Sequence, residues 1–252
     1  MKPISFDGKT AVITGAGSGM GLLTSKELAR TGAAVVMCDI NGEALAKAAD
    51  EVNAAGGGTA IPLVVDVRMF ADAERAAALA LERTGRIDLV IPFAGGYEPR
   101  MCDSPVPFYE QPVDVLDWGI DVNLKGAIYF ARACMPAMVK GGRGGVICCL
   151  GSTSGFEGDA KGAMYGTAKS GLFAFVKGLA LAGAPHGIRA FCVTPGPVMT
   201  RPGMAGMKTL LNTQAETQEL VDYILYLCSD NGRCVTGSNH VMDCGRLTMK
   251  PQ

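Results

Sequence analysis

Short apolar runs alternate with longer amphipathic segments along almost the whole chain. The first apolar runs, residues 10–14 (TAVIT) and 33–39 (AAVVMCD), are continuous, and residues 19–31 between them have helical spacing of apolar positions. Continuous apolar strands are typical of a parallel sheet that helices cover on both faces. The same alternation predicts helices at 41–55, 71–83, 117–140, 164–181 and 216–229, and strands at 60–66, 87–91, 145–150, 188–194 and 239–243.

No linker rich in proline, glycine or charge divides this alternation into halves. The Pro-rich stretch 97–112 is expected to form an ordered surface loop rather than a domain boundary. The sequence therefore predicts an α/β fold, a single doubly wound Rossmann-type domain with a central, mainly parallel sheet over residues 1–252.

Composition narrows the classes of partner. The chain is 48% hydrophobic and 19% charged, with a formal net charge of -1 and no acidic or basic block. Nucleic acid and anionic membranes are therefore not expected as partners. The apolar run near the amino terminus is too short for a secretory signal or a membrane span, which predicts a cytoplasmic protein.

The nine cysteines include no CxxC pair and no Cys/His cluster. We expect them to be buried, reduced thiols that act as small apolar side chains, and we expect no metal site. Adjacent Cys148 and Cys149 should point to opposite faces of a strand.

The glycine-rich segment TGAGSGMG lies between the first strand and the first helix. Backbone N–H groups at such a turn, together with the helix N-terminus, form a site for a phosphate. Asp39 ends the second strand, twenty residues after Gly19, where a carboxylate can bind the adenosine ribose hydroxyls. This favours NAD over NADP, because a 2′-phosphate would meet a like charge that neither Ser18 nor Ile40 neutralises. The alternative is that Asp39 caps the next helix.

A second group of polar residues follows the fifth predicted strand. Tyr165 and Lys169 are four residues apart at the start of a predicted helix, so their side chains share one face. Ser152 follows the fifth strand, thirteen residues before Tyr165, at the carboxyl edge where open α/β sheets bind ligands. A Tyr–Lys pair at this spacing is common in proteins, so the pair gains its weight from Ser152 at the same edge of the sheet.

Further segments complete a recognisable pattern. They are DVNLKG around Asn123, Asp66-Val67 after the third strand, YGTAK from Tyr165, TPGPVMT from Thr194 and the closing TGSNHVMDCG. With the glycine-rich turn, Asp39 and Ser152, these segments resemble the single-domain short-chain dehydrogenase/reductase family nearly from end to end.

The resemblance implies an NAD-dependent oxidoreductase that transfers a hydride between nicotinamide and a secondary alcohol or ketone. Tyr165 would transfer the proton, Lys169 would favour the phenolate and bind the nicotinamide ribose, and Ser152 would hold the substrate oxygen. Asn123 would anchor a water that relays the proton, or would instead bond nearby backbone. A homo-oligomer, either a tetramer or a dimer, is also implied. Cofactor contacts are implied at Gly15, Gly17, Ser18, Gly19, Met20, Gly21, Asp39, Ile40, Asp66, Val67, Ala94, Gly95, Tyr165, Lys169, Pro195, Gly196, Val198 and Thr200.

The chain departs from the family pattern in several places, including Phe191, which replaces an asparagine usual in the sixth strand. Where the family usually has Asn-Asn-Ala-Gly, this sequence reads Pro92-Phe93-Ala94-Gly95, which removes two amides and one backbone donor. The substrate lid after Thr200 is also short, so we expect the Pro-rich stretch 97–112 to do part of its work. An apolar wall in the lid favours a bulky alcohol such as a steroid, unless its members are ordinary core residues. These lid residues are Met204, Met207, Leu210 and Leu211.

Three other functions are possible for a chain with this pattern: a hydrolase, an epimerase or dehydratase, and a binding protein without turnover. A serine hydrolase is disfavoured because Thr153 occupies the centre of GSTSG. An epimerase or dehydratase of similar architecture would usually need a longer carboxyl-terminal substrate domain. An NAD-binding sensor or scaffold without turnover is the main alternative, favoured only by the altered Pro92-Phe93 turn.

Overall fold

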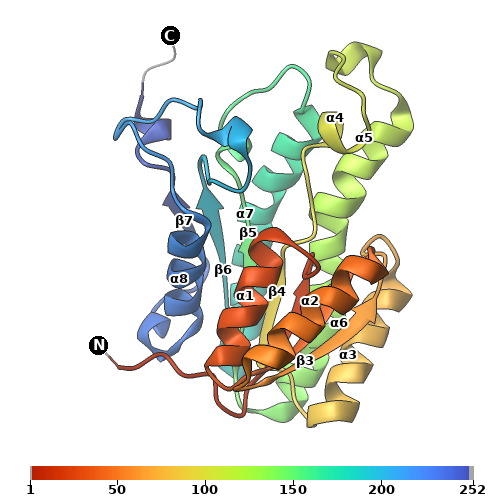
Figure 1. Cartoon of the computed structure of the whole chain (residues 1–252), viewed down its shortest axis with the longest axis vertical. Helices are drawn as coiled ribbons and strands as arrows, with labels where there is room; N and C mark the ends of the chain where they lie inside the picture. Colours follow the sequence, from red (N-terminus) through yellow and green to blue (C-terminus); the bar gives the residue numbers. More distant parts are fainter. Residues whose placement is uncertain (1, 250–252) are drawn as a thin grey trace.

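Seven strands form one sheet in the computed structural model, which describes residues 2–249 (Figure 1). The strand order is β3-β2-β1-β4-β5-β6-β7, and every neighbouring pair is parallel. The predicted doubly wound α/β fold is confirmed, and the sheet is parallel throughout rather than mainly so. The strands are β1 (Thr10–Thr14), β2 (Ala34–Asp39), β3 (Thr59–Val64), β4 (Leu89–Pro92), β5 (Gly145–Leu150), β6 (Ile188–Pro195) and β7 (Asn239–Met242).

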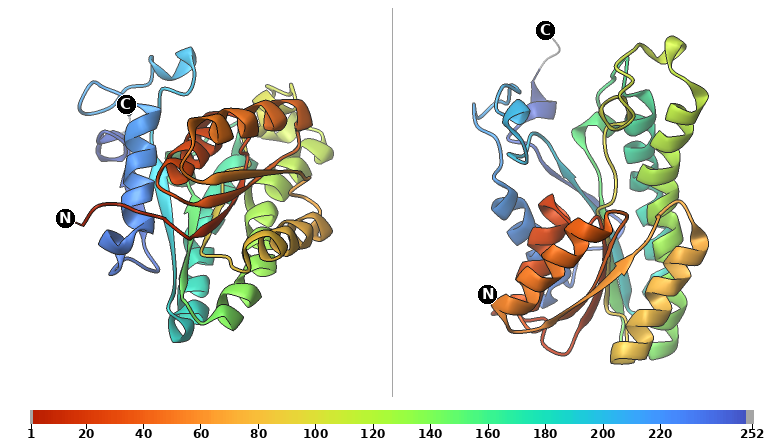
Figure 2. Two further views of the ribbon diagram at one scale, coloured as in Figure 1. Left: turned by 60° about the horizontal axis from the view of Figure 1, so that its bottom comes forward. Right: turned by 45° about the vertical axis from the view of Figure 1, so that its right-hand side comes forward.

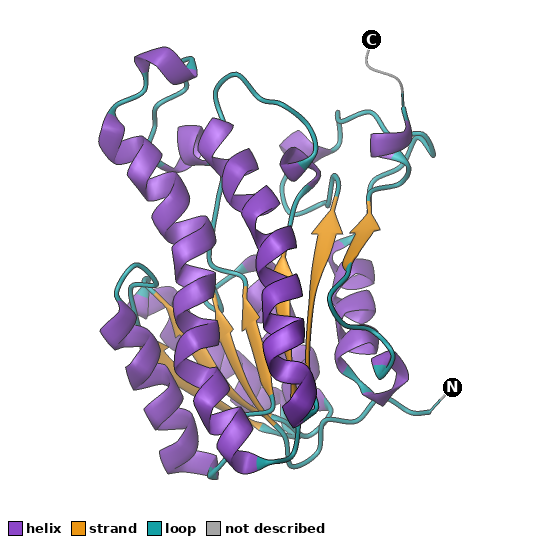
Figure 3. Cartoon of the chain, turned by 180° about the vertical axis from the view of Figure 1, so that it is seen from behind, coloured by secondary structure: helices purple, strands orange, loops and turns teal. Residues whose placement is uncertain are grey.

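Helices cover both faces of the sheet, as Figure 2 shows in two orientations. Residues of α1 (Gly19–Arg30), α2 (Gly42–Ala55) and α8 (Thr217–Cys228) pack into the core on one face. Residues of α3 (Phe70–Thr84), α6 (Gly126–Gly141) and α7 (Ala163–Gly183) fill the core on the other, where Figure 3 shows these three helices in front of the strands. The apolar continuity of the strands follows from this double coverage.

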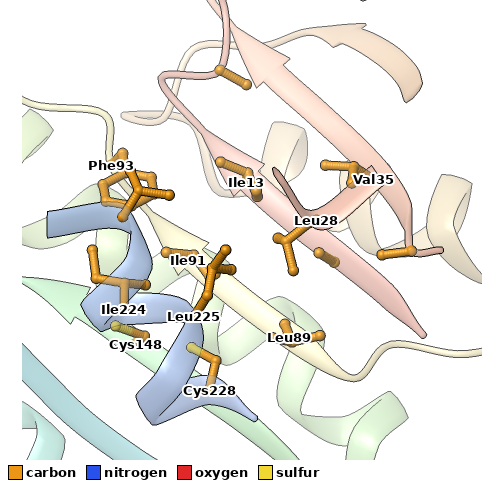
Figure 4. Close-up of a cluster of buried hydrophobic side chains, with 14 of the residues drawn as sticks. Ile13, Leu28, Val35, Leu89, Ile91, Phe93, Cys148, Ile224, Leu225 and Cys228 are labelled. Atoms are coloured by element: carbon orange, nitrogen blue, oxygen red, sulfur yellow. The ribbon is translucent and has the colours of Figure 1, made fainter. Parts of the chain in front are cut away.

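The two cores divide the side chains of each strand between them. Around α1 and α8, Leu28 and Ile224 pack against Ile13 and Ile91 of the sheet (Figure 4). Cys148 belongs to this core and Cys149 to the opposite one, which confirms the predicted opposite orientation of the two thiols. All nine cysteines are free thiols, and six of them are buried.

The helix expected from residue 117 begins four residues earlier, as α5 (Val113–Ile120). Pro112 precedes it with a φ of -59°, a value that suits the entry to a helix. A π-helical turn, Asp121–Lys125, then connects α5 to α6 without a break. Such turns insert one extra residue and are frequent at functional sites. Here the turn buries the side chain of Asn123, which is 2% exposed.

The Pro-rich stretch is ordered, but it is not simply a surface loop. It contains α4 (Glu98–Met101), and both Glu98 and Pro99 are buried. Further along, the backbone N–H of Phe108 donates to the carbonyl of Ala160 at 2.9 Å, and Nε2 of Gln111 donates to the carbonyl of Lys161 at 2.6 Å. The stretch is therefore fastened to the segment that leads into α7.

The Pro92-Phe93 departure changes the sheet locally. β4 pairs with β1 from Leu89 to Pro92, but with β5 only at Leu89 and Val90. Beyond the strand, the N–H groups of Phe93 and Ala94 donate to the carbonyl and the hydroxyl of Thr14 at 3.2 and 3.0 Å. The turn after β4 is therefore held by β1, even though the family's two amides are missing.

Membrane insertion has no candidate helix in this fold. Within residues 2–249, none of the helices combines the length and the apolar character that crossing a bilayer requires.

Candidate active site

A cavity of about 640 Å³ lies at the carboxyl edge of the sheet. Its lining begins at the turn after β1, passes the ends of β2, β3, β4 and β5, and continues to the segment after β6. Ser152, Tyr165 and Lys169 line it, and so do all of the predicted cofactor-binding residues except Gly17. Asn123 is not part of the lining. One cavity therefore unites most of what the sequence predicted.

The glycine-rich turn fits closely against the neighbouring strand ends. A Cβ atom at Gly15, which has a φ of +67°, would lie 2.9 Å from the backbone nitrogen of Ala94, and a Cβ at Gly21 would collide with the Gly15 carbonyl. Gly19 differs, because a Cβ there would have no described atom within 4 Å. The turn thus leaves open space at the N-terminus of α1, where orphan N–H groups can bind a pyrophosphate. The residues present fit a dinucleotide.

Asp39 lies at the end of β2 and lines the cavity. Its Oδ2 accepts a hydrogen bond from the Gly17 N–H at 2.9 Å, and its Oδ1 accepts one from the Asn41 N–H at 2.9 Å. The N-cap of α2 is Asn41, whose side chain accepts from Ala44, so the alternative role of Asp39 as helix cap is wrong. Gly17 is buried, and it acts by holding the Asp39 carboxylate.

Asp66 forms an ion pair with Arg68 that the sequence did not predict. Nη2 of Arg68 lies 2.6 Å from Asp66 Oδ2, and Nε of Arg68 lies 2.9 Å from Oδ1. These hydrogen bonds hold the pKa of the Asp66 carboxyl below its usual value, against the opposing effect of partial burial. Both residues line the cavity next to Val67. A pair of opposite charges therefore stands at the end of β3.

Tyr165 and Lys169 occupy one face of the first turns of α7, as their spacing predicted. Nζ of Lys169 lies 5.5 Å from the centroid of the Tyr165 ring. The same ammonium donates to the carbonyl of Leu150 at 2.7 Å, and the lysine is only 4% exposed. A buried cation must be held by oriented polar groups, and here the end of β5 provides one.

Ser152 lies directly beyond β5 and is half-buried. Its Oγ accepts a hydrogen bond from the Ser154 N–H at 3.2 Å, which caps a short 3₁₀ turn. Because a hydroxyl both accepts and donates, its proton is still able to bond an oxygen inside the cavity.

Asn123 binds backbone with both ends of its amide. Its Oδ1 accepts from the Gly96 N–H at 2.9 Å, and its Nδ2 donates to the carbonyls of Gly96 and Gly119 at 3.0 and 2.9 Å. This geometry matches the backbone-bonding alternative of the sequence analysis. It fixes the segment after β4 to the π-helical turn, while the water relay remains a prediction.

Several lining residues were not predicted as site residues. Tyr97, Arg100 and Met101, from the beginning of the Pro-rich stretch, lie at the cavity as a lid would. Of the four residues predicted as the apolar wall of the lid, Met204 and Met207 line the cavity, whereas Leu210 and Leu211 are 56% and 68% exposed and lie outside the lining. No local pattern marks the unpredicted members as site residues. They also include Phe93, Trp118, Val122 and Arg201.

Metal ligation has no candidate in the described part of the chain. Across residues 2–249, no group of three or more His, Cys, Asp or Glu side chains is arranged to hold an ion.

Comparisons with known proteins agree with this geometry. A sequence model described as short chain dehydrogenase matches residues 9–209. The L-rhamnose 1-dehydrogenase (NAD(P)(+)) of Azotobacter vinelandii is 32% identical over 251 residues, covering 94% of this chain and 96% of the relative. The trans-4-hydroxycyclohexanecarboxylate dehydrogenase of Sinomonas cyclohexanicum is 34% identical over 249 residues, covering 94% and 92%.

A solved structure gives the same result. Carveol dehydrogenase from Mycobacterium avium in complex with NAD superposes with a TM-score of 0.89 at 27% identity, covering 98% of this chain and all 100% of that chain. The family match spans most of the chain, and the relatives are matched over nearly their whole length. The chain therefore belongs to the short-chain dehydrogenase/reductase family of oxidoreductases.

Proposed function

We propose that the protein is an NAD-dependent dehydrogenase that interconverts a secondary alcohol and its ketone, with Tyr165 as the proton-transfer residue. The observation that carries the proposal is the shared cavity, in which Ser152, Tyr165 and Lys169 lie together with the glycine-rich turn. An alternative function would have to explain why a buried ammonium is held beside a phenol.

Lys169 places its ammonium beside the phenol of Tyr165, with Nζ 5.5 Å from the centroid of the ring. The carbonyl of Leu150 fixes the ammonium in place, so its charge is already positioned when the proton moves. Tyr165 then accepts the proton of the alcohol and returns it in the reverse direction, while Ser152 bonds the substrate oxygen.

NAD supplies the acceptor for the hydride when it is bound. The N-terminus of α1 and the glycine-rich turn would hold its pyrophosphate, Asp39 the adenosine ribose, and Asp66 with Val67 the adenine. The segment Pro195, Gly196, Val198 and Thr200 would shape the nicotinamide pocket.

The substrate end of the cavity combines apolar walls with two cations. Met101, Trp118 and Met204 supply the apolar surface, which suits the bulky alcohol expected from the sequence. Arg100 and Arg201 line the same cavity, and within residues 2–249 neither has an ion-pair partner. We therefore propose a ring alcohol that carries a carboxylate away from the reacting carbon. A relative named for a hydroxycyclohexanecarboxylate supports this class.

Assembly and location remain proposals. We propose a homo-oligomer, a tetramer or a dimer, that works in the cytoplasm. Small residues on α6 and α7 could allow close helix contact between subunits, but they do not support a particular interface. Gly126 lies against Val67, Gly171 lies against Leu124, and Ala131 is buried within the chain.

Replacing Tyr165 by phenylalanine removes the proton-transfer hydroxyl and keeps the ring. We expect kcat to fall by at least about a hundredfold, the usual contribution of general acid–base catalysis. NADH affinity, followed by fluorescence titration, should stay within about threefold because that hydroxyl is one of many cofactor contacts. Turnover above a tenth of the wild-type rate would refute the proposed role. Tight NADH binding without turnover of any alcohol by the wild type would favour the sensor.

Replacing Asp39 by alanine removes the like charge that a 2′-phosphate would meet. The ratio of kcat/KM for NAD to that for NADP should fall at least about tenfold, equivalent to about 1.4 kcal/mol. Asp50→Ala, an exposed change on α2, is the control for net charge and should leave the ratio unaltered. An unchanged ratio in Asp39→Ala would show that cofactor choice lies elsewhere.

Replacing Gly21 by alanine forces a Cβ into the carbonyl of Gly15. The turn must shift, so we expect NADH binding to weaken at least about tenfold, a cost of about 1.4 kcal/mol. Gly178→Ala on α7 is the matched control, because a Cβ there meets no described atom within 4 Å. It should leave binding unchanged and raise the melting temperature slightly, since alanine favours helix. Equal binding in both variants would contradict the close fit of the turn.

Replacing Arg100 and Arg201 together by glutamine tests the proposed substrate class. For trans-4-hydroxycyclohexanecarboxylate, kcat/KM should fall at least about tenfold, as expected when charged partners of a ligand are lost. For the primary amide of the same ring alcohol, the change should stay within about twofold because no charge is paired. If the wild type turns over both compounds equally well, the class is wrong, although the proposed reaction would stand.

A further inference from the structure

Glu98 is a fully buried carboxylate outside the predicted site. It begins α4, is 0% exposed, and has no ion-pair partner within residues 2–249. Both of its oxygens accept hydrogen bonds from backbone. Oε1 accepts from the Met164 N–H at 2.9 Å, and the Tyr165 N–H lies 3.2 Å from each oxygen. A buried acid in this position requires a reason, because burying a charge without a cation is costly.

The reason lies in the helix that carries Tyr165. The N-cap of α7 is Gly162, which has no side chain to accept the first N–H groups of the helix. Glu98 accepts them instead, from 66 residues earlier in the chain. Its charge also suits the positive end of a long helix. The amide that it holds includes that of Tyr165 itself, so the carboxylate fixes the backbone of the proposed proton-transfer residue.

Tyr97 adds a second contact to the same turn. Its ring packs edge-on against the ring of Tyr165, with centroids 6.1 Å apart and planes at 83°. Its hydroxyl donates to Oδ2 of Asp159 at 3.0 Å, and Oδ1 of Asp159 accepts from the N–H groups of Lys161 and Gly162. Burial and the Asp159 carboxylate raise the pKa of Tyr97 to about 12, so its phenol remains a donor near neutral pH.

The position of Glu98 is fixed from the other side by Asn123. The Asn123 amide accepts from the N–H of Gly96 and donates to the Gly96 carbonyl, two residues before Glu98. Gly162 completes the fit, because a Cβ there would collide with the Tyr97 ring. Residues 96–98 therefore connect the π-helical turn to the first turn of α7.

We propose that Glu98 is a positioning residue for proton transfer, holding the first turn of α7 so that the Tyr165 hydroxyl stays aligned with Lys169 and the substrate. The inference rests on the proposed function of Tyr165. It assigns no contact between Glu98 and the substrate, since the carboxylate acts only through the backbone of α7.

Three variants test the proposal by kinetics. Glu98→Ala removes the acceptor, Glu98→Asp keeps the charge but shortens the reach, and Glu98→Gln keeps an oxygen at the original distance. We expect kcat to fall about tenfold or more in Glu98→Ala and Glu98→Asp, the scale of a displaced catalytic group. Glu98→Gln should stay within about threefold, and KM for NAD should change less than about twofold in all three.

Hydrogen exchange gives a readout that does not depend on turnover. The peptide that spans the start of α7 should exchange faster in Glu98→Ala and Glu98→Asp, and at about the wild-type rate in Glu98→Gln. Asp88→Ala is the control, because Asp88 is also a buried carboxylate, 4% exposed, and accepts the Thr10 N–H at 2.9 Å; unlike Glu98, it is paired with Arg86 at 2.6 Å. It lies at the opposite end of the sheet, so it should lower the melting temperature while leaving kcat and the α7 peptide unchanged.

The outcomes separate this inference from the proposed function. A kcat in Glu98→Asp equal to that of Glu98→Gln, with unchanged exchange at α7, would overturn the positioning role even if Glu98→Ala does not fold. Retained activity in Tyr165→Phe would refute the proposed function instead, and the exchange measurements would still decide whether Glu98 holds the helix.

Discussion

The constraint on which this structure depends is the parallel direction of all seven strands. Each crossover delivers the next strand end to the same edge of the sheet, so residues far apart in the chain meet there. Gly15, Asp39, Ser152 and Thr200 lie at or beyond the ends of four different strands and still line one cavity. The close approach of Gly15 to Ala94 then fixes the gap between β1 and β4, where the strand order reverses and the dinucleotide site opens.

Two buried charged side chains lie near Tyr165 at this edge of the sheet. The Lys169 ammonium is held by a carbonyl at the end of β5, and the Glu98 carboxylate by N–H groups at the start of α7. Neither is neutralised by an opposite side-chain charge within residues 2–249, and each uses backbone dipoles instead. Tyr165 lies between these two charges, in the first turn of α7. Glu98 thus fixes the backbone of Tyr165, and Lys169 lies beside its ring.

Much of this organisation was predictable from the sequence, because it depends on local patterns. Residues 10–14 and 145–150 were assigned to strands with their observed bounds, since each is an apolar run bounded by turn residues. The Tyr165–Lys169 face followed from helical spacing, and Asp39 from its place at the end of β2. The parallel sheet followed from strands without polar alternation.

The remaining features depend on contacts between distant segments. Glu98 reaches a helix 66 residues away, and only the side-chain-free N-cap at Gly162 hinted that α7 needs an outside partner. The π-helical turn that buries Asn123 is likewise set by packing rather than by local pattern. Arg68 was missed because its pairing with Asp66 depends on the conformation of the turn after β3.

We propose that this edge of the sheet transfers a hydride from a carbinol carbon to nicotinamide. The most direct measurement incubates the protein with NAD and trans-4-hydroxycyclohexanecarboxylate deuterated at the carbinol carbon, followed by mass spectrometry of the reduced cofactor. We expect the deuterium on the nicotinamide ring. Reduced cofactor without the label, or bound cofactor that is never reduced by this or any other secondary alcohol, would contradict it.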